Sequence, residues 1–518
     1  MRNKNHLSIR ASVNWGERSI PIVLALSLML SLVLTASMPL VALRGQPILL
    51  QLAAERPDEM VRVIVQKVAQ DASVEEAVVR LGGAVTLDLH IINAFAATLP
   101  AGAVPELSRS AGVRWVSLDA PLQSTACTSD CLTSVNNLRN AYIQSIRADK
   151  VWLQPAKRQG TGIGVAVVDS GVNSQMDLYT LSGRNRVVAS VRFNTDYNPS
   201  TYDNYGHGSH VAGVVGGNGR TSNGAYIGVA PMADIINVKV SNDDGSATTS
   251  MVVAGLQWLY DNRNNYNLRV VNISLNSAVA ESYHTSPLDA AVEVLWFNKI
   301  VVVVSAGNTG EAALYPPAND PFVITVGAVD DKGTASLNDD VIPTFSAYGT
   351  TSDGFAKPDL VAPGKNIVSL MGNSSGGIPA QHPNNWVDGS YYRMSGTSTS
   401  APMVAGAAAL LLEDEPNLTP DQVKYRLTAT AKKAWAGYNS TKAGAGYLDA
   451  YAAVNGATTA SANTGLQASQ LLWTGSQPVN WGSVTWNSVN WSSVNWSSVN
   501  WSSVNWSSVN WSSDYWGD

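Results

Sequence analysis

Charged residues are scarce in this 518-residue chain: they make up 14% of it, whereas 45% of the residues are hydrophobic. A disordered chain has the opposite balance, so the composition predicts buried cores. The formal net charge is only −6, and no run rich in Lys and Arg is present. Nucleic acid is therefore excluded as an expected partner. The length suggests two to four structural units.

Cysteine is almost absent, since Cys127 and Cys131 are the only two. A metal site built on this pair lacks partners, because no histidine lies between residues 91 and 206. A short local disulfide is the better interpretation if the chain is exported. It would close a small loop and constrain little chain entropy.

Long apolar runs are also absent, with one exception near the N-terminus. Basic residues from Arg2 to Arg18 precede the apolar run Ile20–Leu34, and small residues follow from Ala36. This order is typical of a secretory signal peptide. We expect residues 1–43 to form such a signal and the protein to be secreted or associated with the cell surface. An uncleaved membrane anchor stays open as an alternative.

A small α+β unit is expected over residues 48–123. Val61–Gln66, Ile91–Leu99 and Val113–Ser117 have the composition of strands, and Ser73–Leu81 has apolar residues at helical spacing. From sequence pattern alone this is an ordinary N-terminal domain.

Residues 142–456 are expected to form the main domain. Its apolar runs are nearly continuous in Val and Ile, as in a parallel sheet covered on both faces. The predicted strands are 163–168, 235–240, 270–274, 300–304 and 322–326. Helical segments such as Ser250–Asn262 and Pro287–Phe297 alternate with them. The alternation predicts a doubly wound, mostly parallel α/β fold.

Three short motifs in this domain carry complementary chemistry. Asp169 follows a predicted strand, His207 lies in His-Gly-Ser-His-Val-Ala-Gly, and Ser398 lies in Ser-Gly-Thr-Ser-Thr-Ser-Ala-Pro. A serine hydroxyl becomes nucleophilic when an adjacent base takes its proton, and a carboxylate can orient that base. Any one motif alone is weak, because single Asp, His and Ser residues in turns are common. His210 is the weaker histidine candidate.

Asn308 adds a fourth element to this set. It ends a small-residue turn after the predicted strand 300–304. Its side-chain amide could donate to the oxyanion of a tetrahedral intermediate.

At these residues the chain resembles the subtilisin-like serine proteases. The order Asp, His, Ser is the subtilisin order. The resemblance implies a secreted endopeptidase that is made as a zymogen and acts on proteins or peptides. It also implies that residues 48–123 are an inhibitory propeptide, a partner of the enzyme's own site. Maturation is then expected between Asp119 and Tyr142, in an exposed polar connector. The chemistry would require no cofactor.

The resemblance extends to the substrate-binding residues, with departures. The family commonly has Ser-Leu-Gly-Gly where Ser274, Leu275, Asn276 and Ser277 stand. We still expect extended substrate to pair with this edge as an added strand. Leu314 falls at the floor of the first pocket, which suggests a modest apolar side chain before the scissile bond.

Structural calcium is a further implication of the resemblance. Asp177 stands at about the family's spacing for a ligand, and the loop 221–224 resembles a shortened carbonyl-ligating loop. Calcium requires six to eight oxygens, which the sequence cannot count. A surface aspartate and an ordinary turn are the alternative.

The C-terminal region has a repeat with the unit Trp-Ser-Ser-Val-Asn. Its tryptophans recur every five residues from Trp481 to Trp516. Neither a helix nor a strand places that spacing on one face. We expect residues 457–472 to be a linker and 473–518 a flexible tail that contacts the cell envelope or polysaccharide. A sticky disordered segment and a small β-solenoid are the alternatives.

Two other functions compete with proteolysis. A non-catalytic binding or adhesion protein could be built on a protease-like domain, but it would have no chemical reason to keep all four residues. An esterase would require a Gly-x-Ser-x-Gly elbow and the order Ser, Asp, His, which this chain does not have.

Overall fold

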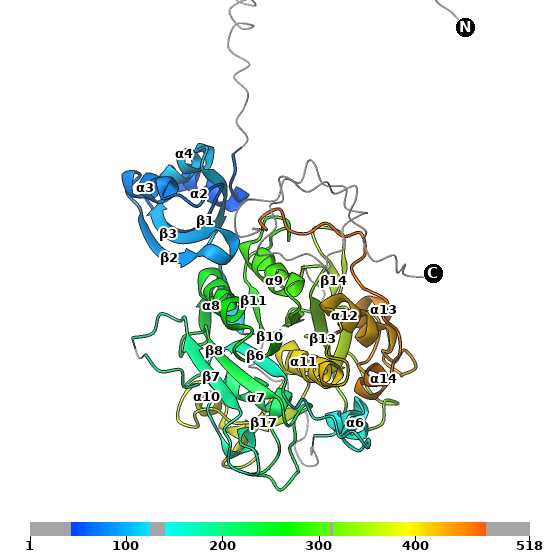
Figure 1. Ribbon diagram of the computed structural model, residues 1–518. Coiled ribbons are helices and arrows are strands. Elements are labelled where there is room, and N and C mark those ends of the chain that lie inside the picture. Colours follow the sequence, from blue (N-terminus) through cyan, green and yellow to red (C-terminus); the bar gives the residue numbers. More distant parts are fainter. Residues whose placement is uncertain (1–42, 125–139, 198, 311–313, 473–518) are drawn as a thin grey trace, which may run out of the picture. The chain divides into compact units, whose positions relative to one another are not determined.

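The computed structural model describes residues 43–124, 140–197, 199–310 and 314–472 (Figure 1). The predicted signal or anchor, both cysteines and the Trp repeat lie outside the described residues, apart from Leu43. Within the described ranges, no helix is both long enough and apolar enough to cross a bilayer.

The N-terminal part is a four-stranded antiparallel sheet in the order β2-β3-β1-β4. Its strands are β1 (Met60–Lys67), β2 (Ala84–Leu89), β3 (Ala94–Pro100) and β4 (Val113–Leu118), and its helices are α2 (Pro47–Glu55), α3 (Ser73–Arg80) and α4 (Val104–Arg109). One face of the sheet packs on these helices around Val63, Val65, Phe95 and Val116. Neither α2 nor β2 was predicted, although the apolar residues Val85, Leu87 and Leu89 of β2 alternate with polar ones.

A seven-stranded parallel sheet forms the centre of the main domain, in the order β16-β13-β12-β10-β6-β8-β7. The strands are β6 (Gly164–Asp169), β7 (Val187–Arg192), β8 (Asp234–Lys239), β10 (Leu268–Ile273), β12 (Val301–Ser305), β13 (Ile324–Val329) and β16 (Leu360–Pro363). All five predicted strands are present, and the doubly wound α/β fold is confirmed. The outer strands β7 and β16 had no Val/Ile signal of comparable length.

Helices cover both faces of this sheet. Helix α7 (His207–Gly216) packs against α11 (Thr397–Asp414). Helix α8 (Thr249–Asn262) packs against α9 (Pro287–Phe297) on the opposite side (Figure 1). The strand order reverses between β6 and β10, and ligand sites in such sheets lie at the carboxyl ends of the strands flanking that point.

A separate three-stranded antiparallel sheet lies next to the central one. It consists of β5 (Pro121–Ser124) between β9 (Ser246–Thr248) and β11 (Leu275–Ser277). Its central strand therefore comes from the end of the N-terminal part, and its outer strands come from the main domain.

The remaining elements surround the central layers. They are α5 (Tyr142–Ser145), α6 (Ala148–Trp152), β14 (Gly349–Thr350), β15 (Ala356–Lys357), β17 (Ile367–Leu370), α10 (Gly377–Gln381), β18 (Tyr391–Met394), α12 (Pro420–Ala429), α13 (Ser440–Ala443) and α14 (Ala450–Val454).

Residues 456–472 differ from the predicted linker. They pack along the main domain, and Ala462, Ala468, Ser469, Leu471 and Leu472 are buried. The Ala- and Ser-rich composition suggested an exposed connector. Here the small side chains instead allow close packing.

Candidate active site

Asp169 and His207 meet at the carboxyl end of β6. The imidazole Nδ1 of His207 donates to Asp169, at 2.8 Å from Oδ1 and 3.0 Å from Oδ2. Both side chains are buried. This contact fixes the tautomer, because Nδ1 carries the proton and Nε2 is left with its lone pair.

Close backbone packing brings this pair together. Gly206, just before α7, has a φ of 93°, which favours glycine. At Gly208, a Cβ atom would lie 2.2 Å from the carbonyl oxygen of Gly171. Any side chain at 208 would push the first turn of α7 away from the turn that carries Asp169.

Ser398 lies at the start of α11 and is fully buried. The helix begins at Thr397, so Pro402 lies in its second turn. A proline there has no N–H to donate to the carbonyl four residues back. The carbonyl of Ser398 accepts instead from the Ser274 hydroxyl at 3.1 Å. This bond joins the start of α11 to the end of β10.

Asn308 follows β12 and contacts the residue next to Ser398. Its Oδ1 accepts from the backbone N–H of Thr397 at 2.9 Å and from the Thr397 hydroxyl at 3.1 Å. These two bonds orient the carboxamide so that its Nδ2 faces away from Thr397. Sequence reasoning did not identify Thr397 as the residue that holds Asn308.

Three buried polar atoms of this site have no hydrogen-bond partner among the described residues: Nε2 of His207, Oγ of Ser398 and Nδ2 of Asn308. Buried polar atoms are normally paired, so each exception requires an explanation. Nε2 of His207 can accept a proton, Oγ of Ser398 is a hydroxyl oxygen, and Nδ2 of Asn308 is a hydrogen-bond donor. Such a set is complementary to a reacting carbonyl group.

Electrostatics favour the charged form of His207. Burial lowers the pKa of its imidazole, but the charge and hydrogen bond of Asp169, with a smaller contribution from the charge of Asp203, outweigh burial and leave the pKa above its ordinary value. His210 behaves differently, because burial lowers its pKa to about 3. Its Nε2 bonds to the carbonyl of Ile367 at 3.0 Å, which is a structural contact.

The substrate-binding residues predicted from the resemblance lie beside β5. Leu275 pairs with Ser124 and Asn276 with Gln123, in antiparallel register. The Asn276 amide donates to the carbonyl of Ser305 at 2.9 Å. Leu314 is buried with Ala306 and Ala347, which flank the turn before Asn308. This small cluster is apolar.

Asp177 is buried, and donors already surround its carboxylate. Oδ1 accepts from the backbone N–H of Thr221 at 2.6 Å, and Oδ2 accepts from the Tyr391 hydroxyl. Nearby, the Arg186 guanidinium donates to the carbonyls of Asp177 and Gly216. In the described part of the chain, no three His, Cys, Asp or Glu side chains are grouped to hold a metal. These residues do not fit a calcium ion as they stand.

The fold and this site together define a serine protease of the doubly wound α/β type. The chain belongs to the subtilase family, whose model matches residues 160–448. It is 37% identical over 344 residues to serine protease AprX of Bacillus subtilis, covering 63% of this chain and 76% of that protein. It is 35% identical over 295 residues to subtilisin DY of Bacillus licheniformis, covering 56% and 90%.

A solved structure extends the similarity. Fervidolysin from Fervidobacterium pennivorans, a keratinolytic enzyme related to subtilisin, aligns with a TM-score of 0.60 at 26% identity. The match covers 77% of this chain and 61% of that one. The family membership makes the protein a subtilisin-like serine protease that acts on proteins or peptides, and subtilases need no cofactor for catalysis.

Proposed function

We propose that Ser398, His207, Asp169 and Asn308 are the residues that hydrolyse the peptide bond. The observation that carries this proposal is the set of three buried, unpartnered atoms on Ser398, His207 and Asn308. Their chemical types are those of a nucleophile, a base and an oxyanion donor. Ser398 and His207 are not hydrogen-bonded to each other, and such contacts often tighten only when substrate binds.

In the proposed first step, His207 Nε2 takes the proton of the Ser398 hydroxyl while Oγ forms a bond to the substrate carbonyl carbon. Asp169 holds the imidazole and stabilises the imidazolium. Nδ2 of Asn308 and the backbone N–H of Ser398 donate to the oxyanion. The carbon–nitrogen bond then breaks, and the imidazolium gives its proton to the leaving amine. Water repeats the sequence on the acyl-enzyme and regenerates Ser398.

A fluorophosphonate probe tests the assignment of Ser398. The probe labels only an activated serine, so we expect it on Ser398 in the mature protein and not in Ser398→Ala. Ser400→Ala is the matched control on the same helix, since the Ser400 hydroxyl is bonded to the Pro363 carbonyl at 3.0 Å. Labelling and casein hydrolysis by Ser398→Ala would refute the role of Ser398. They would also favour a non-catalytic function for this site.

We further propose that the protein is made as a zymogen and that residues 48–123 form its inhibitory propeptide. Support comes from β5, which adds a strand between β9 and β11 in the way an extended substrate would. Leu122 on β5 is buried, whereas the strand ends at Ser124 beside Leu275. Ser274, the residue before Leu275, bonds to Ser398. The cleaved bond is therefore expected just after Ser124.

The substrate preference proposed for this site is a modest apolar side chain before the scissile bond. The cluster of Leu314, Ala306 and Ala347 supports it, and the Asn276 side chain stands where a glycine is usual. Hydrolysis of paired peptides that carry Leu or Lys at this position tests it. Equal kcat/KM values would contradict the proposal.

Secretion and surface attachment remain proposals that rest on sequence. The basic residues before the apolar run Ile20–Leu34 support export, and the Trp repeat supports contact with envelope polysaccharide. Both are tested by fractionating the host cells and by binding assays on chains that end before residue 473.

A further inference from the structure

The segment 456–472, here called the strap, is anchored along the main domain by hydrogen bonds to its backbone and to the side chain of Asn463. Near its start, Arg426 donates from Nε to the carbonyl of Thr458 at 3.1 Å, and Gln422 donates to the carbonyl of Thr459 at 3.1 Å. Asn463 donates in turn to the carbonyl of Phe322 at 3.0 Å and to Asp421 at 2.7 Å. The strap is therefore part of the fold.

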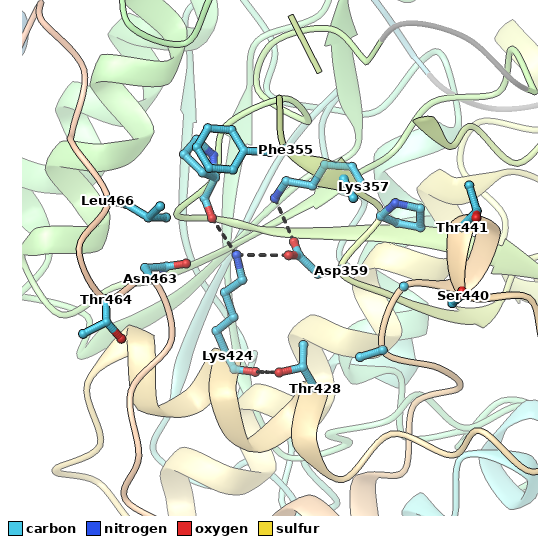
Figure 2. A pocket seen from close by; sticks show the side chains of 15 residues that line it. Phe355, Lys357, Asp359, Lys424, Thr428, Ser440, Thr441, Asn463, Thr464 and Leu466 are labelled. Carbon is cyan, nitrogen blue, oxygen red and sulfur yellow. Dashed lines mark hydrogen bonds and ion pairs between the residues drawn. The ribbon is translucent and has the colours of Figure 1, made fainter. Parts of the chain in front are cut away.

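The strap also forms one wall of a cavity of about 490 Å³ (Figure 2). Asn463, Thr464 and Leu466 line it from the strap, opposite Lys357 and Asp359. Lys424 reaches Asp359 at 3.1 Å and also donates to the carbonyls of residues 321–323. The Lys424 ammonium group therefore already has its partners within the main domain.

The middle of the strap covers a buried carboxylate. The backbone N–H of Ser469 donates to Oε2 of Glu293 at 2.7 Å, and Glu293 is fully buried in α9. The Gln470 N–H donates to the carbonyl of His284 at 2.9 Å. In these contacts, groups of the main domain bind the strap as far as the N–H group of Gln470.

The carbonyl groups of the last three strap residues are bound by side chains of the N-terminal part. Gln66 on β1 donates from Nε2 to the carbonyl of Leu471. Arg114 on β4 donates to the carbonyls of Gln470 and, at 3.4 Å, Leu472. Gln66 and Arg114 both belong to the N-terminal part, at neighbouring places where β1 pairs with β4. Two planar donor groups thus bind three successive carbonyls.

Burial strengthens these contacts. Gln66, Leu471 and Leu472 are all buried, and burial lowers the pKa of Arg114 to about 10, so that the guanidinium stays charged at neutral pH. Hydrogen bonds from a charged donor such as Arg114 contribute more to stability than hydrogen bonds between neutral groups.

We propose that residues 470–472 of the strap are a binding surface for the propeptide, separate from the substrate cleft and from the contacts of the propeptide with α8 and α9, which retains the propeptide after the connecting chain has been cut. The proposal rests on the proposed zymogen function. Cleavage beyond Ser124 removes the covalent link but none of the bonds from Gln66 and Arg114. The strap therefore slows the release of the propeptide and lengthens the interval between cleavage and activity.

The test uses the full-length protein and compares Arg114→Leu and Gln66→Leu with the parent chain. Arg109→Leu is the matched control, because Arg109 is an exposed arginine of the same N-terminal part. Mass spectrometry follows cleavage, size-exclusion chromatography follows the retained propeptide, and peptide hydrolysis follows activity. We expect unchanged cleavage and roughly tenfold faster release in Arg114→Leu, from the loss of charge-assisted bonds. Arg109→Leu should match the parent.

Release at the parental rate in both Arg114→Leu and Gln66→Leu, after normal cleavage, would overturn the proposal. A parent chain that is never cleaved would instead refute the zymogen function. Hydrogen exchange gives a second measurement that does not depend on these variants folding. In the uncleaved Ser398→Ala protein the amides of residues 470–472 should exchange at least about tenfold more slowly than in the mature protein. Equal protection in the two proteins would also overturn the proposal.

Discussion

The Ser170 hydroxyl donates a hydrogen bond to the carboxylate of Asp203 at 2.8 Å, and this contact joins the two segments that carry Asp169 and His207. Asp203 also accepts from the N–H groups of Gly206 and Ser209, each at 2.7 Å. The Ser170 oxygen accepts from the N–H of Gly208 at 2.9 Å. Asp203 thus fixes the first turn of α7 relative to the turn after β6.

Asp203→Asn should lower kcat/KM and move its acid limb to lower pH. The Asp203 charge contributes to the raised pKa of His207, so removing it lowers that pKa. The base must be neutral, and activity is lost as pH falls through the His207 pKa. A pH profile of kcat/KM checks the shift, with Asp339→Asn, an exposed position, as control. An unchanged acid limb would remove Asp203 from the electrostatics of the site.

Asn308→Ala should fold and lose roughly 10²–10³ in kcat, since one oxyanion donor is removed. The size of this effect is the one known for the corresponding subtilisin donor. Single-turnover kinetics on a small peptide substrate separate the chemical step from binding, and KM should change little. If the rate were unaltered, the unpartnered Nδ2 of Asn308 would need another explanation.

Asp320→Asn should stabilise the protein at pH 8 more than at pH 4. Asp320 is fully buried, and burial raises its pKa to about 6, although Lys357 opposes the shift. A carboxyl group whose pKa is raised by folding contributes stability to the folded protein at pH values below its unfolded pKa. This contribution is lost as the pH rises through the folded-state pKa of about 6. Asparagine keeps the acceptor that binds the N–H of Phe322 at 2.8 Å.

This gain in stability is on the order of 1–3 kcal/mol at pH 8. Thermal unfolding is measured in the Ser398→Ala background, where autolysis cannot interfere. A gain of equal size at pH 4 and pH 8 would mean that ionisation of Asp320 is not its cause.

Removing calcium should leave the melting temperature of the Ser398→Ala protein unchanged. Both carboxylate oxygens of Asp177 already accept hydrogen bonds, from Thr221 and Tyr391. A ligand that binds only the folded state raises stability with its concentration. A higher melting temperature in millimolar calcium than in EDTA would contradict this prediction.

The central strands, and the site residues that directly follow them, could be predicted from short stretches of sequence. The Val- and Ile-rich runs gave the central strands because a sheet covered on both faces requires them. Asp169 and Asn308 could be placed because each follows such a strand, and the topology then brings strand ends together. Ser398 could be identified from its motif, and the structure places it at the start of α11.

Long-range contacts were not accessible in this way. Gln66 and Leu471 are separated by 405 positions, and neither has a sequence signal that points to the other. The strap contains Ala and Ser residues that are equally common in exposed linkers, so its burial depends on Glu293 and His284 receiving its amides. Asp203 was missed for a related reason, because its contact with Ser170 spans 33 positions.

The intact mass of the purified protein tests the central claim most directly. If Ser398 is the nucleophile and β5 occupies the substrate cleft, the parent chain should begin just after Ser124 and before Tyr142. Ser398→Ala should then keep every residue of the N-terminal part from the signal junction onward. A parent chain that still begins near Ile48, or a Ser398→Ala protein cut at the same place as the parent, would contradict self-processing by this site.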